Sequence, residues 1–244
     1  MRPLILETAT NLSPEDLVSA LLAESAPGIV LLRSGGPFSE QARYSFVAAR
    51  PFLSFRSLGS RCESSAAGRE RVQFGNPWHV LDSLMQRYEM IDSLELPFPL
   101  GGCFGYWGYD LKNFVEPKLP RVAVNDLEIP DAVVGFYDSI AAFDHHLGKS
   151  WIISTGLNVE GERDAGRAEA AARFWQSLLG RGSDDLQLPL SRAEWQPSGD
   201  FVSTLCREAF IDRVRAAQEY IRKGDIYQVN LAHRLEFQLS RNPW

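Results

Sequence analysis

The most informative stretch of this sequence is Gly224-Asp225-Ile226-Tyr227-Gln228-Val229-Asn230-Leu231-Ala232-His233-Arg234-Leu235. Apolar and polar residues alternate along it, which is typical of a β-strand with one buried face. We therefore predict a strand over Ile226–Leu239. Its polar face carries two amides, Gln228 and Asn230, just after a tight turn. Since an amide both donates and accepts hydrogen bonds, these two side chains are candidates for lining a small-molecule cavity, although an ordinary half-solvated strand is the alternative interpretation.

The residues before this stretch indicate two domains. Phe210, Val214, Ala217 and Ile221 recur on one face of a predicted helix that Gly224 ends. Residues 180–199 are rich in Gly, Ser, Asp and Pro, as is typical of a surface loop. We predict a first domain over residues 1–182, a linker over 183–200, and the beginning of a second domain over 201–244.

The first domain shows runs of strands with helices inserted among them, which predicts an α+β fold with antiparallel sheets and helices on the outside. Ser13 and Asn76 stand where they can cap helices that begin with Pro14 and Pro77. A third helix is predicted over Arg163–Leu179. The predicted strands are Ala26–Arg33, Arg43–Ser57 with a break at Pro51, a hairpin over Arg61–Phe74 with Gly68 at its tip, Asp131–Asp144, and Ser150–Thr155.

Composition excludes several classes of function. The 244 residues carry 25 Lys and Arg against 31 Asp and Glu, and no basic stripe could neutralise a nucleic acid backbone. No apolar run is long enough to cross a bilayer. Cys62, Cys103 and Cys206 are widely spaced, which predicts three reduced thiols in a cytoplasmic protein. The histidines lack metal-ligand spacing, and we expect the pair His145-His146 to be solvated in a turn.

A second glycine-rich stretch is Gly101-Gly102-Cys103-Phe104-Gly105-Tyr106-Trp107-Gly108-Tyr109-Asp110. Glycines three residues apart are also found in phosphate-binding loops. However, no Lys-Ser or Lys-Thr follows, and aromatic residues fill the gaps. We predict instead that these glycines allow close backbone packing in a sheet.

Three segments resemble the anthranilate synthase component I-like family of chorismate-using enzymes. The run Gly224–Leu235 resembles the motif that opens the chorismate-binding domain of aminodeoxychorismate, anthranilate and isochorismate synthases. The run Gly101–Asp110 resembles the family's Gly-Gly-x-x-Gly-Tyr element. Arg43-Tyr44-Ser45-Phe46, after Glu24-Ser25, resembles the N-terminal signature of the anthranilate and aminodeoxychorismate branches.

The resemblance implies a pocket for L-tryptophan in the first domain, where some family members bind this amino acid. Carried over residue by residue, the candidates are Ser25, Arg43, Tyr44, Ser45 and Phe46. The sequence departs from the family in having Ala23 before Glu24-Ser25, where Leu is usual. A buried strand crossing without a ligand is an equally good interpretation of these residues.

Two features favour the aminodeoxychorismate branch. Asn230 within Gln-Val-Asn-Leu resembles these enzymes, whereas anthranilate synthases more often have an apolar residue there. Tyr137-Asp138, ahead of Asp144-His145, resembles the same branch. The resemblance then implies amination of chorismate at C4, magnesium as cofactor, and a glutamine amidotransferase subunit as the source of ammonia.

No catalytic residue and no metal ligand is assigned in this chain, because the family's metal-binding glutamates and proton-transfer groups belong to a later part of the sequence. The ending Arg241-Asn242-Pro243-Trp244 suggests truncation, and we expect no synthase activity from these 244 residues alone. The alternatives are anthranilate synthase component I, a non-catalytic tryptophan-binding regulatory module, and a scaffold that docks a glutaminase subunit.

Overall fold

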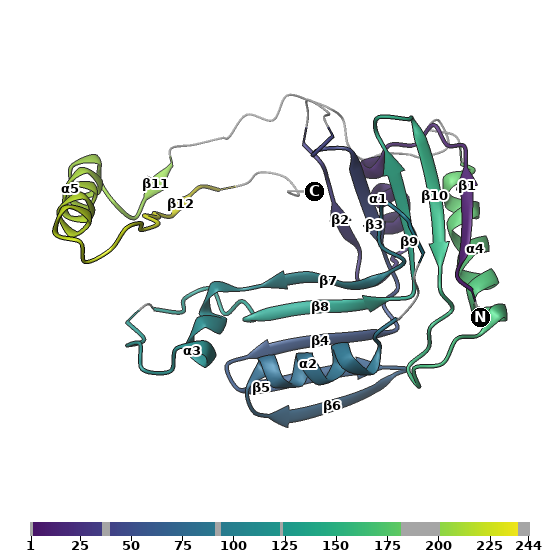
Figure 1. Cartoon of the computed structure of the whole chain (residues 1–244), viewed down its shortest axis with the longest axis horizontal. Coiled ribbons are helices and arrows are strands. Elements are labelled where there is room, and N and C mark those ends of the chain that lie inside the picture. Colours follow the sequence, from purple (N-terminus) through teal and green to yellow (C-terminus); the bar gives the residue numbers. More distant parts are fainter. Residues whose placement is uncertain (1, 36–39, 91–93, 123, 182–200, 239–244) are drawn as a thin grey trace. The chain divides into compact units, whose positions relative to one another are not determined.

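The structure is a computed structural model that describes residues 2–35, 40–90, 94–122, 124–181 and 201–238 (Figure 1). The chain divides into two compact units, residues 1–188 and 189–244. This division falls within residues 183–200. The predicted linker itself lies outside the described residues, so the domain assignment stays a prediction.

Two five-stranded antiparallel sheets make up the first unit. The first sheet has the order β1 (Leu4–Thr8), β10 (Lys149–Ser154), β9 (Ser139–Asp144), β3 (Tyr44–Ala48), β2 (Val30–Leu32). The second has the order β6 (Arg69–Phe74), β5 (Arg61–Ala66), β4 (Leu53–Leu58), β8 (Ala132–Tyr137), β7 (Gly102–Trp107). Figure 1 shows the strands of one sheet running across the direction of the other. The predicted α+β class with antiparallel sheets is confirmed.

Two neighbouring strands pass together from one sheet to the other. The chain passes from β3 to β4 and, later, from β8 to β9. β3 pairs with β9 in the first sheet, and β4 pairs with β8 in the second. The predicted break at Pro51 separates β3 from β4. The single strand predicted over Asp131–Asp144 is wrong, because the chain changes sheets at Asp138. There the carbonyl oxygen of Asp138 accepts hydrogen bonds from the backbone N–H (2.7 Å) and the hydroxyl (3.0 Å) of Thr155.

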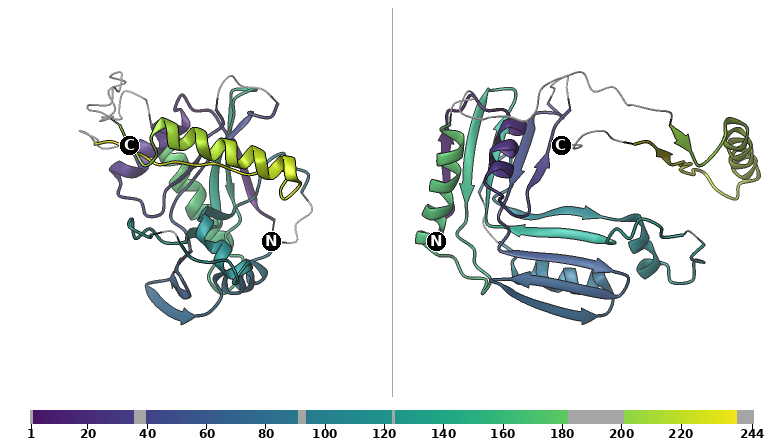
Figure 2. Two further views of the ribbon diagram at one scale, coloured as in Figure 1. Left: turned by 90° about the vertical axis from the view of Figure 1, so that its left-hand side faces the viewer. Right: turned by 180° about the vertical axis from the view of Figure 1, so that it is seen from behind.

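Helices cover the outer faces of the sheets, as the sequence predicts. α1 (Pro14–Ala23) begins with a capping box in which Ser13 and Asp16 each accept the other's backbone N–H. α1 and α4 (Ala165–Leu179) lie on the same face of the first sheet (Figures 1 and 2). Their buried side chains pack on the strands in one apolar core that includes Leu17, Leu21, Val47, Phe143, Ile152, Trp175 and Leu178. α2 (Pro77–Arg87), capped by Asn76, packs on the second sheet.

Gly105 of β7 and Gly101, just before β7, stand where the backbone of β8 comes very close. A Cβ atom on Gly105 would lie 2.1 Å from the carbonyl oxygen of Val133, and one on Gly101 would lie 2.5 Å from that of Tyr137. No other residue type fits at such distances. The interpretation of this stretch as close packing in a sheet is therefore confirmed. Short helices follow it at Tyr109–Leu111 and at α3 (Lys112–Val115).

The second unit consists of α5 (Arg207–Lys223) and a two-stranded ribbon of β11 (Val202–Ser203) and β12 (Leu235–Glu236). Gly224 ends α5 in the left-handed conformation, φ 78°, as predicted. The strand predicted over Ile226–Leu239 is wrong for residues 226–234, which are irregular. Alternation gives a chain the capacity to form a strand, but a strand needs a partner, and the described part of this unit offers only β11.

We expect the substitution Gly105→Ala to lower the free energy of unfolding by about 2 kcal/mol or more, because the new methyl group would displace the backbone of β8. Gly75→Ala is the matched control, since its Cβ would meet nothing within 4 Å. Urea denaturation of both variants measures the difference. Equal losses of stability would contradict the close approach of β7 and β8.

Candidate functional site

The two amides predicted to line a substrate cavity, Gln228 and Asn230, lie in the irregular segment after α5 and are exposed. Their neighbour Tyr227 is 92% exposed. The two amides are separated by one residue in the chain, and neither of them lines the pocket that the described residues of this unit form around Phe210 and His233. Their role in substrate binding stays a prediction.

Arg43, the first of the predicted tryptophan-binding residues after Ser25, makes an ion pair across the first sheet. Its Nη2 and Nε atoms lie 2.6 and 2.9 Å from the Oδ2 atom of Asp144. The Oδ1 atom of Asp144 accepts the backbone N–H groups of His146 and Leu147. Burial would raise the pKa of Asp144, but these hydrogen bonds outweigh it and hold that pKa at about 2.

Ser45 points to the other side of β3 from its neighbours. Its hydroxyl is buried, lies 2.7 Å from Nε2 of His145, and accepts the backbone N–H of Ser34 at 3.0 Å. The expectation that His145 is solvated is therefore wrong, whereas His146 is exposed. Burial and the nearby charge of Arg33 lower the pKa of His145.

Tyr44 and Phe46 share the opposite face of β3. Their rings stack with centroids 6.3 Å apart, and Tyr44 meets the ring of Phe98 edge-on at 6.0 Å. Side chains alternate along a strand, so the side chain of Ser45 lies on one face of β3 and those of Tyr44 and Phe46 lie on the other. One ligand on a single face of the sheet cannot contact all three side chains. The structure thus separates the predicted pocket residues into two sets.

Ser25 lies just beyond the C-terminal end of α1 with a left-handed backbone, φ 52°. It is exposed, and within the described part of the chain no hydrogen bond joins it to residues 43–46. The adjacent Glu24 forms an ion pair with Arg181. The assignment of Ser25 to a tryptophan pocket stays a prediction.

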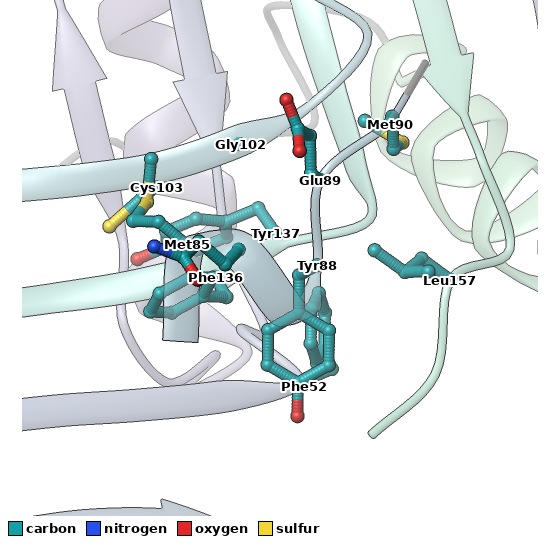
Figure 3. Close-up of a pocket in the computed structure, with 11 residues that line it drawn as sticks. Phe52, Met85, Tyr88, Glu89, Met90, Gly102, Cys103, Phe136, Tyr137 and Leu157 are labelled. Atoms are coloured by element: carbon teal, nitrogen blue, oxygen red, sulfur yellow. The ribbon is translucent and has the colours of Figure 1, made fainter. Parts of the chain in front are cut away.

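A pocket of about 380 Å³ lies between α2 and the second sheet (Figure 3). Phe52, Tyr88, Phe136 and Leu157 form its apolar wall, and Met85 and Met90 lie at its rim. Tyr88 is buried, with 8% of its surface exposed, whereas Met85 is 47% exposed. The sequence feature that could have indicated this pocket is the presence of Met85 and Met90 on either side of the C-terminal end of α2. Flexible thioethers favour adaptable binding surfaces.

The polar groups of this pocket are uncharged at neutral pH, apart from Glu89 at its edge. Burial raises the pKa of the Cys103 thiol to about 11 and that of the Tyr137 hydroxyl to about 12. A thiol that stays protonated is a poor nucleophile. The pocket is therefore suited to hold an apolar or aromatic body rather than to act through the Cys103 thiol.

The part of the chain that the structure describes contains no group of three or more His, Cys, Asp or Glu side chains that could hold a metal ion. Nor does that part contain a helix of the length and apolarity needed to span a membrane. The three cysteines are unpaired, as predicted.

The paired sheets with outer helices define an antiparallel α+β fold of known type. The structure is similar to that of anthranilate synthase component I from Streptococcus pneumoniae TIGR4, with a TM-score of 0.61 and 23% identity, over 97% of this chain and 51% of the other. The family model for chorismate binding enzymes matches residues 41–244. The chain therefore belongs to the chorismate-binding enzyme family, as the three sequence segments indicate.

Individual relatives come from two branches of this family. Aminodeoxychorismate synthase component 1 from Escherichia coli (strain K12) is 30% identical over 221 residues, which is 89% of this chain and 44% of the relative. Anthranilate synthase component 1 from Acetivibrio thermocellus is also 30% identical, over 88% of this chain and 44% of the relative. The chain thus spans less than half the length of these curated relatives.

The pKa of Asp144 lies below the ordinary value of 3.8, so its ion pair stabilises the fold above that pH and ceases to do so as the pH falls towards 2. Between pH 6 and pH 2 we expect this carboxylate to account for a loss of about 2 kcal/mol in the free energy of unfolding. Asp144→Asn should lack this part of the pH dependence. Asp212→Asn, on the exposed surface of α5, should retain it. The measurement is urea denaturation across the pH range, and identical pH profiles for Asp144→Asn and the wild type would argue against the ion pair.

Proposed function

We propose that this chain is the N-terminal part of an aminodeoxychorismate synthase component I. The full enzyme would aminate chorismate at C4 to 4-amino-4-deoxychorismate, on the route to para-aminobenzoate and folate. The observation that carries the proposal is the unbroken run Gly224–Leu235 with Asn230 in it. Tyr137-Asp138 supports the same branch, and membership of the chorismate-binding family supports the substrate class.

The proposed enzyme takes its ammonia from a glutamine amidotransferase subunit and works in the cytoplasm. Magnesium, when bound in the family, holds the substrate carboxylate and polarises the ring. The described side chains of this chain do not form a site for the magnesium ion. These side chains therefore have no proposed role in the magnesium-dependent step. Their proposed contribution is to bind substrate through the amides of Gln228 and Asn230.

Anthranilate synthase component I is the second candidate function. The relative from Acetivibrio thermocellus is as similar to this chain as the aminodeoxychorismate relative from Escherichia coli, at 30% identity. The third candidate, a tryptophan-binding regulatory module, depends on the residues around β3.

Purified residues 1–244, given chorismate, Mg²⁺ and ammonium, should form neither aminodeoxychorismate nor anthranilate above a buffer control. The gene product that contains this chain, together with any sequence encoded after Trp244, should form aminodeoxychorismate under the same conditions. Chromatography with fluorescence detection distinguishes the two products. Anthranilate as the main product would reject the proposed branch, and turnover by residues 1–244 would reject the assignment of catalysis to a later segment.

Tryptophan binding has its own test in calorimetry on the wild-type chain. If the pocket exists, Ser25→Ala should raise the Kd by about tenfold, which is the effect of one lost hydrogen bond to a charged group. The variant keeps a Cβ atom, so the left-handed backbone at this position is equally strained in both proteins. Ser83→Ala on the exposed face of α2 is the control and should leave the Kd unchanged. Absence of binding by the wild type would remove tryptophan from the proposal.

A further inference from the structure

We propose that a second pocket, in the corner where β3 leads to β4 and β8 leads to β9, binds a small monocarboxylate. This corner pocket has a volume of about 220 Å³ and is lined by Arg50, Asp138, Ser139, Arg167, Ala171 and Phe174, among others. It lies entirely in the first unit. It shares no residue with the apolar pocket beside α2, with the predicted tryptophan residues or with the amides after α5.

Arg50 is the main candidate for contact with the anion. Its guanidinium carbon lies 3.9 Å from the centroid of the Phe174 ring, so the ring supports one face of the cation. In the part of the chain that the structure describes, no carboxylate pairs with Arg50. A guanidinium stacked in this way keeps its N–H groups in the plane of the fork, where they match the two oxygens of a carboxylate.

The backbone at Arg50 is unusual in a way that fits a binding role. Its φ is 57°, in the left-handed region that side chains other than glycine rarely adopt. A hydrogen bond of 2.8 Å from its N–H to the carbonyl oxygen of Pro27 holds this conformation. Such conformations persist where the surroundings impose them, and they gather at ligand-binding positions.

Arg167 supplies a second cation and is fixed by its own partners. Its Nε atom donates to Oδ2 of Asp138 at 2.7 Å and to the carbonyl oxygen of Leu157 at 2.9 Å. Its two Nη groups have no acceptor among the described residues. Asp138, by contrast, is buried, with 5% of its surface exposed, and is held by Arg167. The guanidinium of Arg167 is therefore bound to the rest of the protein only through Nε. Its two terminal Nη groups remain as donors for a ligand.

Ser139, which is buried, adds an uncharged donor to the lining of the corner pocket. Its Oγ atom accepts the Nε1–H of fully buried Trp175 at 3.0 Å. Because the indole can only donate, the hydroxyl hydrogen of Ser139 remains to be donated. A hydroxyl in the same lining as Arg50 and Arg167 is suited to donate to a carboxylate oxygen.

Charge and size define the ligand class. Two arginines and one aspartate give the lining a net charge of about +1, which a monoanion balances and a phosphate dianion exceeds. The methyl groups of Ala170 and Ala171 leave room for a short carbon chain rather than a large ring system. Propionate has both properties and is the probe for the test.

Propionate is titrated into the wild-type chain at pH 7 in calorimetry, with propionamide and inorganic phosphate as comparison ligands. We expect propionate to bind, propionamide to give no heat above dilution, and phosphate to bind at least tenfold more weakly than propionate. Arg50→Gln should weaken propionate binding by about tenfold, because a charge-assisted hydrogen bond is lost. Ala171→Leu should block binding by filling the pocket while leaving every charge in place.

Arg173→Gln on α4 is the control for Arg50→Gln, since it makes the same change at an arginine that pairs with Glu169 and does not line the pocket. It should bind propionate as the wild type does. Thermal melts show that each variant is folded before it is titrated. Equal binding of propionate and propionamide, stronger binding of phosphate, or wild-type affinity in both Arg50→Gln and Ala171→Leu would each overturn the proposal.

Discussion

The turn of two paired strands from one sheet into the other constrains the whole first unit. At this corner, backbone groups leave the regular ladder while remaining buried, and a buried carbonyl without a donor is costly. Thr155 satisfies the carbonyl oxygen of Asp138 with both its backbone N–H and its hydroxyl. Arg167 pairs with the carboxylate of the same residue. The corner therefore depends on Thr155, directly after β10, and on Arg167 of α4.

Local residues were sufficient to predict most elements of the first unit. Ser13 and Asn76 mark helix starts because their side chains cap the first turn, and Gly68 marks a hairpin tip. The bend at Asp138 could not be predicted in this way. Nothing in the run 131–144 differs locally from one continuous strand, and the partners that bend it come from residues 155 and 167. The strand predicted over residues 226–234 was wrong for the same reason. Alternation of polar and apolar residues shows which side chains would share a face, but it does not show whether another strand is there to pair with.

The candidate site shows the same division between local and distant information. Sequence motifs were enough to identify the family, and the match over residues 41–244 confirms that result. They grouped Tyr44, Ser45 and Phe46 as one lining, whereas strand geometry places Ser45 opposite the two rings. Neither the apolar pocket beside α2 nor the corner pocket was predicted, because each is formed by residues far apart in the chain. Phe52 meets Phe136 in one, and Arg50 meets Phe174 in the other.

The order of strands in the first sheet also bears on how the protein is made. β1 pairs with β10 in a register that joins Leu4 to Ser154. During synthesis at about 5–20 residues per second, the first strand must then wait several seconds for its partner. Until then it is an apolar strand with open edges, which can bind other strands or a chaperone. The second sheet has all its strands once β8 is made, whereas the first sheet needs β10 and the corner needs Arg167 of α4. The first sheet and the corner are therefore completed late in translation, after the second sheet.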